Sequence, residues 1–186
     1  MAFPPVTQKL SGLAQITENL YLGSARAASD SAVVSCLQIT CIINATENTV
    51  NNATPAVEHI RIPVVDSPST QMIDHFDAIA DKIHCVEEQR GRTLVHCNAG
   101  VSRSSTLCLA YLMKYRDMSL IEAHGWVKAR RPIIRPNSGF WKQLIEYEHK
   151  LRGISTVRMI MSSVGELPDL YEKEVKDMVA LRNLFT

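Results

Sequence analysis

The sequence predicts an α/β fold in which a central mixed, mostly parallel sheet is flanked by helices within a single domain. Short apolar runs rich in β-branched residues alternate with segments of helical length, the order typical of such layered structures. A chain of 186 residues is long enough for one domain with a sizeable core. The hydrophobic content of 46% excludes a largely disordered chain.

Before residue 66 the pattern predicts three strands and one short helix. The strands are expected at Leu20–Gly23, Ile39–Asn44 and Val57–Val65, and the helix at Ser29–Leu37. Ser29 or Asp30 is the candidate cap of that helix, because both side chains accept hydrogen bonds from backbone N–H groups at a helix start. Asn48–Pro55 is polar and is predicted to form a turn.

After residue 66 the chain is predicted to be mainly helical, with one more buried strand. In chain order we expect a helix at Thr70–Arg90, a strand at Thr93–His96, and helices at Ser104–Arg116, Ser119–Arg130 and Ser138–Leu151. In the last part of the chain, Thr156–Met161 is predicted to form an added strand. Leu170–Phe185 has apolar residues close to helical spacing and is predicted to form a helix.

The segment from Cys97 to Ser104 combines a thiol with a loop suited to binding an anion. Its sequence, Cys-Asn-Ala-Gly-Val-Ser-Arg-Ser, lies between the buried strand and a helix. A loop of small residues can turn several backbone N–H groups inward, and a helix start adds partial positive charge. Both effects stabilise a thiolate and bind a phosphate dianion. Because Arg103 can hold two phosphate oxygens at once, the segment predicts a cysteine that attacks phosphorus.

Five residues of this region together resemble the His-Cys-x5-Arg-Ser/Thr signature of the cysteine-dependent protein phosphatases: His96, Cys97, Gly100, Arg103 and Ser104. A Cys-x5-Arg spacing alone arises often by chance, whereas this combination in a strand–loop–helix context is specific. The resemblance implies a phosphate-binding loop made of Asn98, Ala99, Gly100, Val101, Ser102 and Arg103. The alternative is an inert buried cysteine followed by an arginine on a helix surface.

Asp66 is the candidate general acid, because cleaving a phosphoester requires a proton donor for the leaving oxygen. It follows the predicted strand at 57–65 in a turn sequence, 31 positions before Cys97. In the resembled family the general acid lies on such a loop at such a separation. The resemblance therefore implies that Asp66 acts as acid in the first step and as base in the second. The alternative is that Asp66 caps the next helix or shapes the turn.

The resemblance also implies supporting roles for His96 and Ser104. His96 would orient the loop and help to lower the pKa of the thiol, and Ser104 would donate a hydrogen bond to the sulfur as it leaves phosphorus. The alternatives are an ordinary core histidine and a hydroxyl in the first turn of a helix. No metal or other cofactor is expected, because the histidines and cysteines show no ligand spacing typical of a metal site.

The stretch from Arg130 to Trp141 also matches the resembled family, in which it lies beside the catalytic loop. The resemblance implies that Asn137 supports the geometry of that loop, although Asn137 is equally suited to capping the helix at 138. Arg130, Arg131 and Arg135 are interpreted as solvated cations near a helix C-terminus, with a role in substrate approach as the alternative.

The resemblance runs from about Gln15 to Arg152 and is greatest to the small atypical dual-specificity phosphatases. It implies a catalytic domain at 15–152, an N-terminal extension at 1–14 and a C-terminal extension at 153–186. We expect the C-terminal extension to pack on the domain, with a partner-binding or targeting segment as the alternative.

The expected reaction is hydrolysis of phosphotyrosine and of phosphoserine or phosphothreonine, because no extra loop that would deepen the pocket for phosphotyrosine alone is evident. Phosphorylated proteins are the expected substrates, and the resemblance suggests mitogen-activated protein kinases. Two alternatives are a catalytically idle phosphoprotein-binding module and a rhodanese-type sulfur transferase. Asp66 argues against the sulfur transferase, which needs no general acid. The intact set of Cys97, Arg103 and Asp66 argues against the idle module.

The overall charge and apolar pattern favour an intracellular enzyme. A net charge of +1 favours neither nucleic acid nor an anionic membrane as a partner. No apolar run approaches the roughly 18 residues that span a bilayer, and the first 20 residues lack the pattern of a secretory signal. The odd number of cysteines, 5, favours reduced thiols. We therefore expect a cytoplasmic location, with the nucleus or an organelle as alternatives. The sequence does not predict the oligomeric state.

Overall fold

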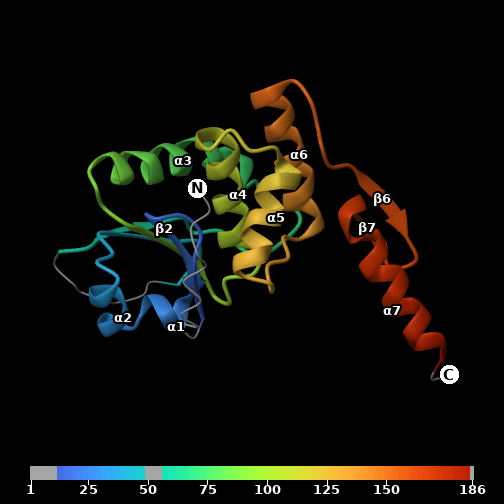
Figure 1. Cartoon of the computed structure of the whole chain (residues 1–186), viewed down its shortest axis with the longest axis horizontal. Coiled ribbons are helices and arrows are strands. Elements are labelled where there is room, and N and C mark those ends of the chain that lie inside the picture. Colours follow the sequence, from blue (N-terminus) through green and yellow to red (C-terminus); the bar gives the residue numbers. More distant parts are fainter. Residues whose placement is uncertain (1–11, 49–55, 185–186) are drawn as a thin grey trace, which may run out of the picture.

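The computed structural model describes residues 12–48 and 56–184 and centres on a five-stranded sheet of order β1-β2-β5-β3-β4 (Figure 1). The strands are β1 (Leu13–Gln15), β2 (Leu20–Ser24), β3 (Cys41–Asn44), β4 (Glu58–Arg61) and β5 (Thr93–Cys97). β1 pairs with β2 in antiparallel fashion, whereas all other pairs in this sheet are parallel. The mixed, mostly parallel sheet predicted from the sequence is confirmed.

Helices cover both faces of the sheet. Two short helices, α1 (Ala25–Ala28) and α2 (Ser31–Cys36), lie on one face, and four longer ones lie on the other: α3 (Ile73–Glu88), α4 (Arg103–Tyr115), α5 (Leu120–Arg130) and α6 (Ser138–Arg152) (Figure 1). Successive side chains of a strand point to opposite faces. In β2, Leu22 accordingly joins the large core under α3–α6, and Tyr21 joins the smaller core under α1 and α2. Both faces are buried, which is the usual state of a parallel sheet.

Several elements begin or end at places that the sequence pattern did not predict. The strand expected to run to Val65 ends at Arg61, because the Val64 N–H donates back to the Ile62 carbonyl at 2.8 Å and does not continue the ladder with β3. The helix expected from Thr70 begins at Ile73, where Gln143 of α6 accepts a hydrogen bond from the Ile73 N–H at 2.8 Å. Of the two candidate caps, Asp30 is the one observed, since its side chain accepts from two backbone N–H groups of α2, whereas Ser29 ends α1. The predicted turn at 48–55 lies mostly outside the described residues.

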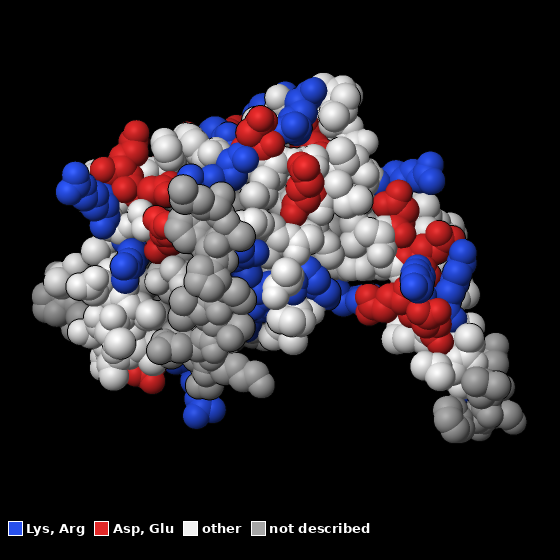
Figure 2. Space-filling view, in the orientation of Figure 1, with Lys and Arg blue, Asp and Glu red and all other residues white. Residues whose placement is uncertain are grey.

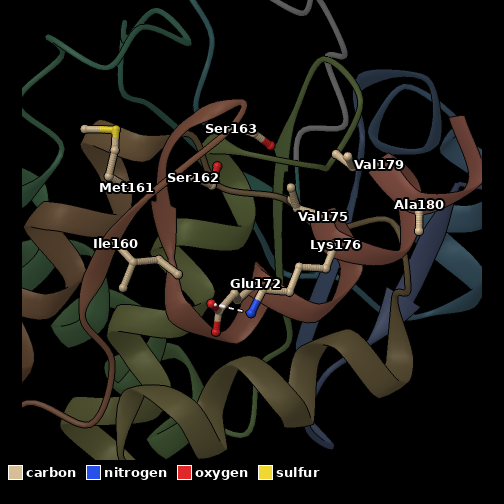
Figure 3. Close-up of a pocket in the computed structure, with 9 residues that line it drawn as sticks. All are labelled: Ile160, Met161, Ser162, Ser163, Glu172, Val175, Lys176, Val179 and Ala180. Atoms are coloured by element: carbon tan, nitrogen blue, oxygen red, sulfur yellow. Dashed lines mark ion pairs between the residues drawn. The ribbon is translucent and has the colours of Figure 1, made fainter. Parts of the chain in front are cut away.

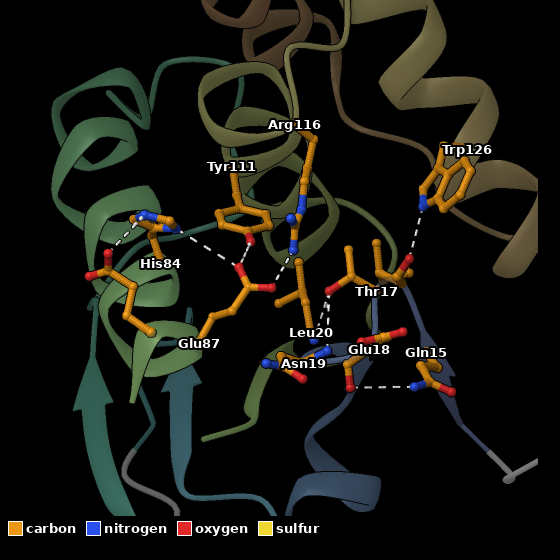
Figure 4. A network of polar contacts seen from close by, with 12 residues as sticks. Gln15, Thr17, Glu18, Asn19, Leu20, His84, Glu87, Tyr111, Arg116 and Trp126 are labelled. Atoms are coloured by element: carbon orange, nitrogen blue, oxygen red, sulfur yellow. Dashed lines mark hydrogen bonds and ion pairs between the residues drawn. The ribbon is translucent and has the colours of Figure 1, made fainter. Parts of the chain in front are cut away.

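A polar network ties the helices to each other and to the sheet (Figure 4). Glu87 of α3 accepts a hydrogen bond from the Tyr111 hydroxyl of α4 at 2.7 Å and pairs with Arg116. On α5, the Trp126 indole N–H donates to the backbone oxygen of Ile16 at 2.8 Å, in the turn between β1 and β2. These contacts join α3 to α4, and α5 to the turn that precedes β2.

The last part of the chain folds into a separate small layer beside α6, which we call the C-terminal unit (Figure 1). It consists of β6 (Met159–Ser162), β7 (Gly165–Pro168), a 3₁₀ turn η1 (Asp169–Tyr171) and α7 (Glu172–Leu184). Its side chains Leu167, Tyr171 and Val175 are buried in the main core. The predicted strand and helix are observed, whereas β7 was missed. No helix within residues 12–48 and 56–184 is both long and apolar enough to cross a membrane.

Deletion of residues 154–186 is expected to lower the melting temperature by about 5–10 °C. The deletion exposes core surface covered by Leu167, Tyr171 and Val175, each worth about 1.5–3 kcal/mol when buried, and the ordering entropy of the segment offsets part of this. Thermal unfolding followed by circular dichroism measures the change. Deletion of 180–186 alone, which spares these residues, is the control. An unchanged melting temperature after the longer deletion would show that the C-terminal unit is not part of the folded domain.

Candidate active site

The predicted phosphate loop connects the end of β5 to the start of α4, so Cys97 is the last residue of the strand and Arg103 the first of the helix. Gly100 lies at the middle of the loop with a φ of +68°, a conformation that L side chains rarely adopt. A Cβ atom there would also lie 2.5 Å from the backbone oxygen of Gly23 in β2. Glycine at position 100 is therefore required both by the turn and by the close packing of the loop on the sheet.

Four consecutive carbonyl groups of the loop are held from outside by other parts of the chain. Asn98 O accepts from the Ala25 N–H at 3.1 Å, Ala99 O and Gly100 O accept from the Arg131 guanidinium at 2.8 and 2.7 Å, and Val101 O accepts from the Arg135 N–H at 2.9 Å. The N–H and C=O of one peptide unit point in opposite directions because the unit is planar and trans. Anchoring the carbonyls outward therefore turns the N–H groups toward the inside of the loop, which creates an anion-binding concavity.

Cys97 lies at the base of this concavity and is 2% exposed. Its Sγ lies 3.1 Å from the Ser104 hydroxyl and accepts a hydrogen bond from the Gly100 N–H at 3.3 Å. Burial raises the pKa of the Cys97 thiol, but hydrogen bonds from Ser104 and from the loop backbone outweigh burial and hold the pKa below its ordinary value. By contrast, burial without such donors raises the pKa of Cys41 to about 11.

His96 is fully buried, and its Nδ1 donates to the Cys97 carbonyl at 3.3 Å. Burial lowers the pKa of His96 below its usual value, so the ring is neutral near pH 7. Its position thus fits the expected orienting role and equally fits a core histidine. The expected effect of His96 on the thiol pKa stays a prediction.

Arg103 is 7% exposed, so it is not the surface helix residue of the alternative interpretation. Its Nη1 donates to the Val64 carbonyl at 3.1 Å, on the segment that leads into the Asp66 loop. The Nε atom is buried and has no hydrogen-bond partner among the residues that the structure describes. The guanidinium is therefore fixed in place and retains donors for an anion in the loop.

Asp66 lies on an exposed loop and faces the phosphate loop. Its Oδ1 accepts hydrogen bonds from the Ser102 hydroxyl at 2.7 Å and from the Asn137 side-chain amide at 2.9 Å. α3 begins after Met72 without a side-chain cap, so Asp66 does not cap that helix. The structure thus brings Asp66, predicted from a separate stretch of sequence, against the loop that holds the cysteine.

Asn137 caps α6 and also contacts Asp66, so its position is compatible with both roles that the sequence left open, and its support of the catalytic loop stays a prediction. Its amide N–H donates to Asp66, and its Oδ1 accepts from the Phe140 N–H at 3.0 Å and so caps α6. Next to it, Gly139 lets α6 approach the Asp66 loop closely, because a Cβ at this position would lie 1.9 Å from the Pro68 carbonyl oxygen. The start of α6 therefore fixes the position of the carboxylate.

Arg131 is a site residue that the sequence interpretation missed. It was expected on the surface but is 7% exposed and donates to two carbonyls of the phosphate loop. Pro132 could have provided the signal, since the residue before a proline is disfavoured in a helix and turns away from it. α5 ends at Arg130, whose guanidinium stacks 3.4 Å over the Trp126 ring. Of these neighbouring arginines, one braces the loop and the other remains at the helix surface.

Comparison with known proteins identifies the family. A family model described as the dual specificity phosphatase catalytic domain matches residues 20–150. The chain belongs to the dual specificity phosphatase family. This phosphatase is 55% identical to human dual specificity protein phosphatase 18 over 172 residues, which cover 92% of each chain. It is 53% identical to human dual specificity protein phosphatase 21 over 167 residues, 90% of this chain and 88% of that one.

The fold of the phosphatase is also that of solved members of the family. The crystal structure of human DUSP28 is 34% identical, covers 81% of this chain and 97% of its own, and superposes with a TM-score of 0.73. The resemblance, the fold class and the assignment as a hydrolase of phosphoproteins are confirmed. The roles of the individual site residues and the domain boundaries stay predictions.

A hollow of about 400 Å³ lies away from the phosphate loop, within the C-terminal unit (Figure 3). It is lined by side chains of β6 and α7, among them Ile160, Val175 and Val179, and includes no residue from 96–104. This hollow is therefore not the active site of the phosphatase. The active site is recognised by the polar groups around Cys97.

Replacing Ser104 by alanine is expected to shift the acidic limb of the kcat/KM profile to higher pH. The Ser104 hydroxyl lowers the pKa of the Cys97 thiol, so its loss raises that pKa and reduces the thiolate fraction at acidic pH. kcat should fall about 10- to 100-fold, the value of one hydrogen bond to a charged group. Initial rates on an aryl phosphate from pH 4.5 to 8 measure both effects. Ser104→Thr keeps the hydroxyl, so the acidic limb of its kcat/KM profile should match that of wild type. An unshifted acidic limb in Ser104→Ala would show that the Ser104 hydroxyl does not lower the pKa of Cys97.

Proposed function

We propose that this phosphatase hydrolyses phosphotyrosine, phosphoserine and phosphothreonine esters through a phosphocysteine intermediate, without a metal ion. The observation that carries the proposal is a buried thiol of lowered pKa at the base of a carbonyl-anchored loop, with a carboxyl group hydrogen-bonded to the same loop through Ser102. Nucleophile, anion site and proton donor are thus all supplied by side chains and backbone of the chain.

In the first step the Cys97 thiolate attacks phosphorus in line with the leaving oxygen. The S–P bond forms and the P–O bond to the substrate breaks, while Asp66 transfers its proton to the departing oxygen. Arg103 and the inward N–H groups of the loop hold the equatorial oxygens. Because both bonds to Asp66 are received by Oδ1, the transferred proton resides on Oδ2.

In the second step water cleaves the phosphocysteine. The Asp66 carboxylate, now ionised, takes a proton from water, and the water oxygen forms a bond to phosphorus as the S–P bond breaks. Ser104 lies 3.1 Å from Sγ and donates to the sulfur as it regains negative charge. The products are inorganic phosphate and the original thiolate, with Asp66 protonated for the next cycle.

The substrates are phosphorylated proteins, as the family requires. Within that class we propose mitogen-activated protein kinases as candidate substrates, on the strength of family resemblance, and a cytoplasmic or nuclear site of action. Phosphate release from a doubly phosphorylated activation-loop peptide of such a kinase would test the first point. Fractionation of cells that express the tagged full chain would test the second.

The mechanism is tested by Asp66→Asn assayed in chelator with substrates of different leaving groups. A phosphothreonine peptide, whose alkoxide needs a proton to leave, should be hydrolysed about 10²–10⁴-fold more slowly by the variant. p-Nitrophenyl phosphate, whose leaving group is a weak base, should be affected much less. Asp74→Asn, an exposed carboxylate on α3, is the matched control and should behave as wild type.

Other outcomes of this assay separate the alternatives. An equal loss on both substrates would show that Asp66 acts only on the structure of the site. Thiosulfate turnover without phosphate release would indicate a sulfur transferase, and tight phosphopeptide binding without any release would indicate an idle binding module.

A further inference from the structure

A groove of about 280 Å³ lies between the start of α6 and the β6–β7 hairpin. Its walls include Pro136 and Asn137 on one side, and Val164, Leu167 and Pro168 on the other. We propose that this groove binds one apolar side chain close to the phosphorylated residue of a protein substrate. The inference rests on the proposed function and adds a sequence preference to it.

The groove is continuous with the catalytic site, because one of its walls is also part of that site. The Asn137 N–H donates to the Ser102 hydroxyl at 3.3 Å, and its side chain donates to Asp66 at 2.9 Å. Arg135, which also lines the groove, donates its N–H to the Val101 carbonyl at 2.9 Å. A single segment, 135–137, thus contacts the phosphate loop and the general acid and forms one wall of the groove.

The path of a bound substrate leads toward this wall. The leaving oxygen must face Asp66 to receive its proton, so the polypeptide that carries this oxygen leaves the site on the Asp66 side. Asn137 contacts Asp66 directly and is also one of the residues that line the groove. Each extended residue advances about 3.3–3.6 Å, so the three positions on either side of the phosphoresidue extend up to about 10 Å from it, and these are the positions to test.

The charged side chains around the groove are paired with one another, so the groove carries little net charge beside its apolar residues. Arg135 pairs with Glu174 of α7 at 2.8 Å and stacks 4.5 Å over the Tyr171 ring, and Lys142 pairs with Glu166 at 2.7 Å. Figure 2 shows basic side chains of the main body meeting acidic ones at the start of α7. With these charges satisfied, the groove favours an uncharged side chain over an acidic or basic one.

The groove has room for an apolar side chain and one rigid wall. Its volume of about 280 Å³ exceeds the roughly 150 Å³ of a cavity that holds a benzene molecule, so a side chain of the size of leucine can enter. Val164 is 62% exposed at the tip of the hairpin, where the Ser162 hydroxyl accepts from its N–H at 3.2 Å and donates to the Gly165 carbonyl at 2.7 Å. The turn therefore presents an apolar side chain to solvent in a fixed position.

The test compares phosphotyrosine peptides in which leucine or aspartate occupies each of the three positions on either side of the phosphoresidue. kcat/KM for each peptide is divided by kcat/KM for p-nitrophenyl phosphate, which is too small to reach the groove. Wild type should prefer leucine by about tenfold at one or more positions, the value of burying one such side chain. Val164→Asp should lose this preference.

Met161→Asp is the matched control, because Met161 is 80% exposed on the same hairpin but lines the other hollow. This variant should keep the wild-type preference. Equal rates for leucine and aspartate peptides in wild type would overturn the proposal. An equal loss of the leucine preference in Val164→Asp and Met161→Asp would also overturn it. Absence of p-nitrophenyl phosphate turnover would instead overturn the proposed function, so the two failures are distinguishable.

Discussion

Cys97→Ser is expected to reduce hydrolysis of every phosphoester by about 10⁵- to 10⁶-fold, the cost of removing a nucleophile. The loop that lowers the pKa of a thiol cannot ionise a serine hydroxyl, whose pKa is far higher, so no nucleophile forms near neutral pH. The two side chains are close in size, and the variant should keep its fold. Rapid acid quenching with ³²P-labelled substrate should trap a phosphoenzyme in wild type and none in the variant.

Cys36→Ser provides the matched control, because Cys36 is an exposed cysteine on α2. It should retain wild-type turnover and the trapped phosphoenzyme. Residual activity of Cys97→Ser above about 1%, or label on a different cysteine of wild type, would show that another group attacks phosphorus.

Arg103→Lys is expected to lower kcat/KM by about 10³-fold while preserving the charge. Lysine cannot reproduce the two parallel N–H donors that match two phosphate oxygens, and removal of such donors costs about 10²–10³ or more in rate. The bond from Arg103 to the Val64 carbonyl, at 3.1 Å, is also lost, which loosens the approach to the Asp66 loop. Competitive inhibition by inorganic phosphate should weaken in parallel with the rate.

Arg130→Lys is the control for this change, since Arg130 stacks on Trp126 at the surface of α5. Its kinetics and phosphate inhibition should match those of wild type. A loss of rate in Arg103→Lys with unaltered phosphate inhibition would mean that Arg103 contributes through the Asp66 loop rather than by binding the phosphoryl group.

The parts of the site that are local in sequence could be predicted, and the parts that depend on distant contacts could not. The strand, loop and helix around Cys97 are specified by adjacent residues, so the pattern located them to within one residue. Asp66 was predicted by its place after a strand. The fixation of the loop by Arg131 was missed, because a buried arginine is recognisable only once its acceptors, the Ala99 and Gly100 carbonyls, are in place.

The difference between local and distant contacts also explains which strands the sequence pattern did not predict. β1 has three residues, Leu13–Gln15, and exists because β2 provides its partner, not because of a pattern of its own. β7 begins with Gly165 and ends with Pro168, two residues that indicate a turn when read locally. Its pairing with β6 supplies the hydrogen bonds that make it a strand. In each case a contact across the chain overrides the local preference.

The outward anchoring of the loop carbonyls makes the reactivity of Cys97 dependent on completed folding. The anchors come from residues 25, 131 and 135, which are distant from the loop in sequence and reach it only when α1, α5 and the segment before α6 have docked. In a nascent or unfolded chain, Cys97 is an ordinary thiol, mostly protonated at neutral pH and slow to react with alkylating agents or peroxide. The rate of alkylation of Cys97 during refolding therefore shows when the anchored loop has formed and the Cys97 thiol has become reactive.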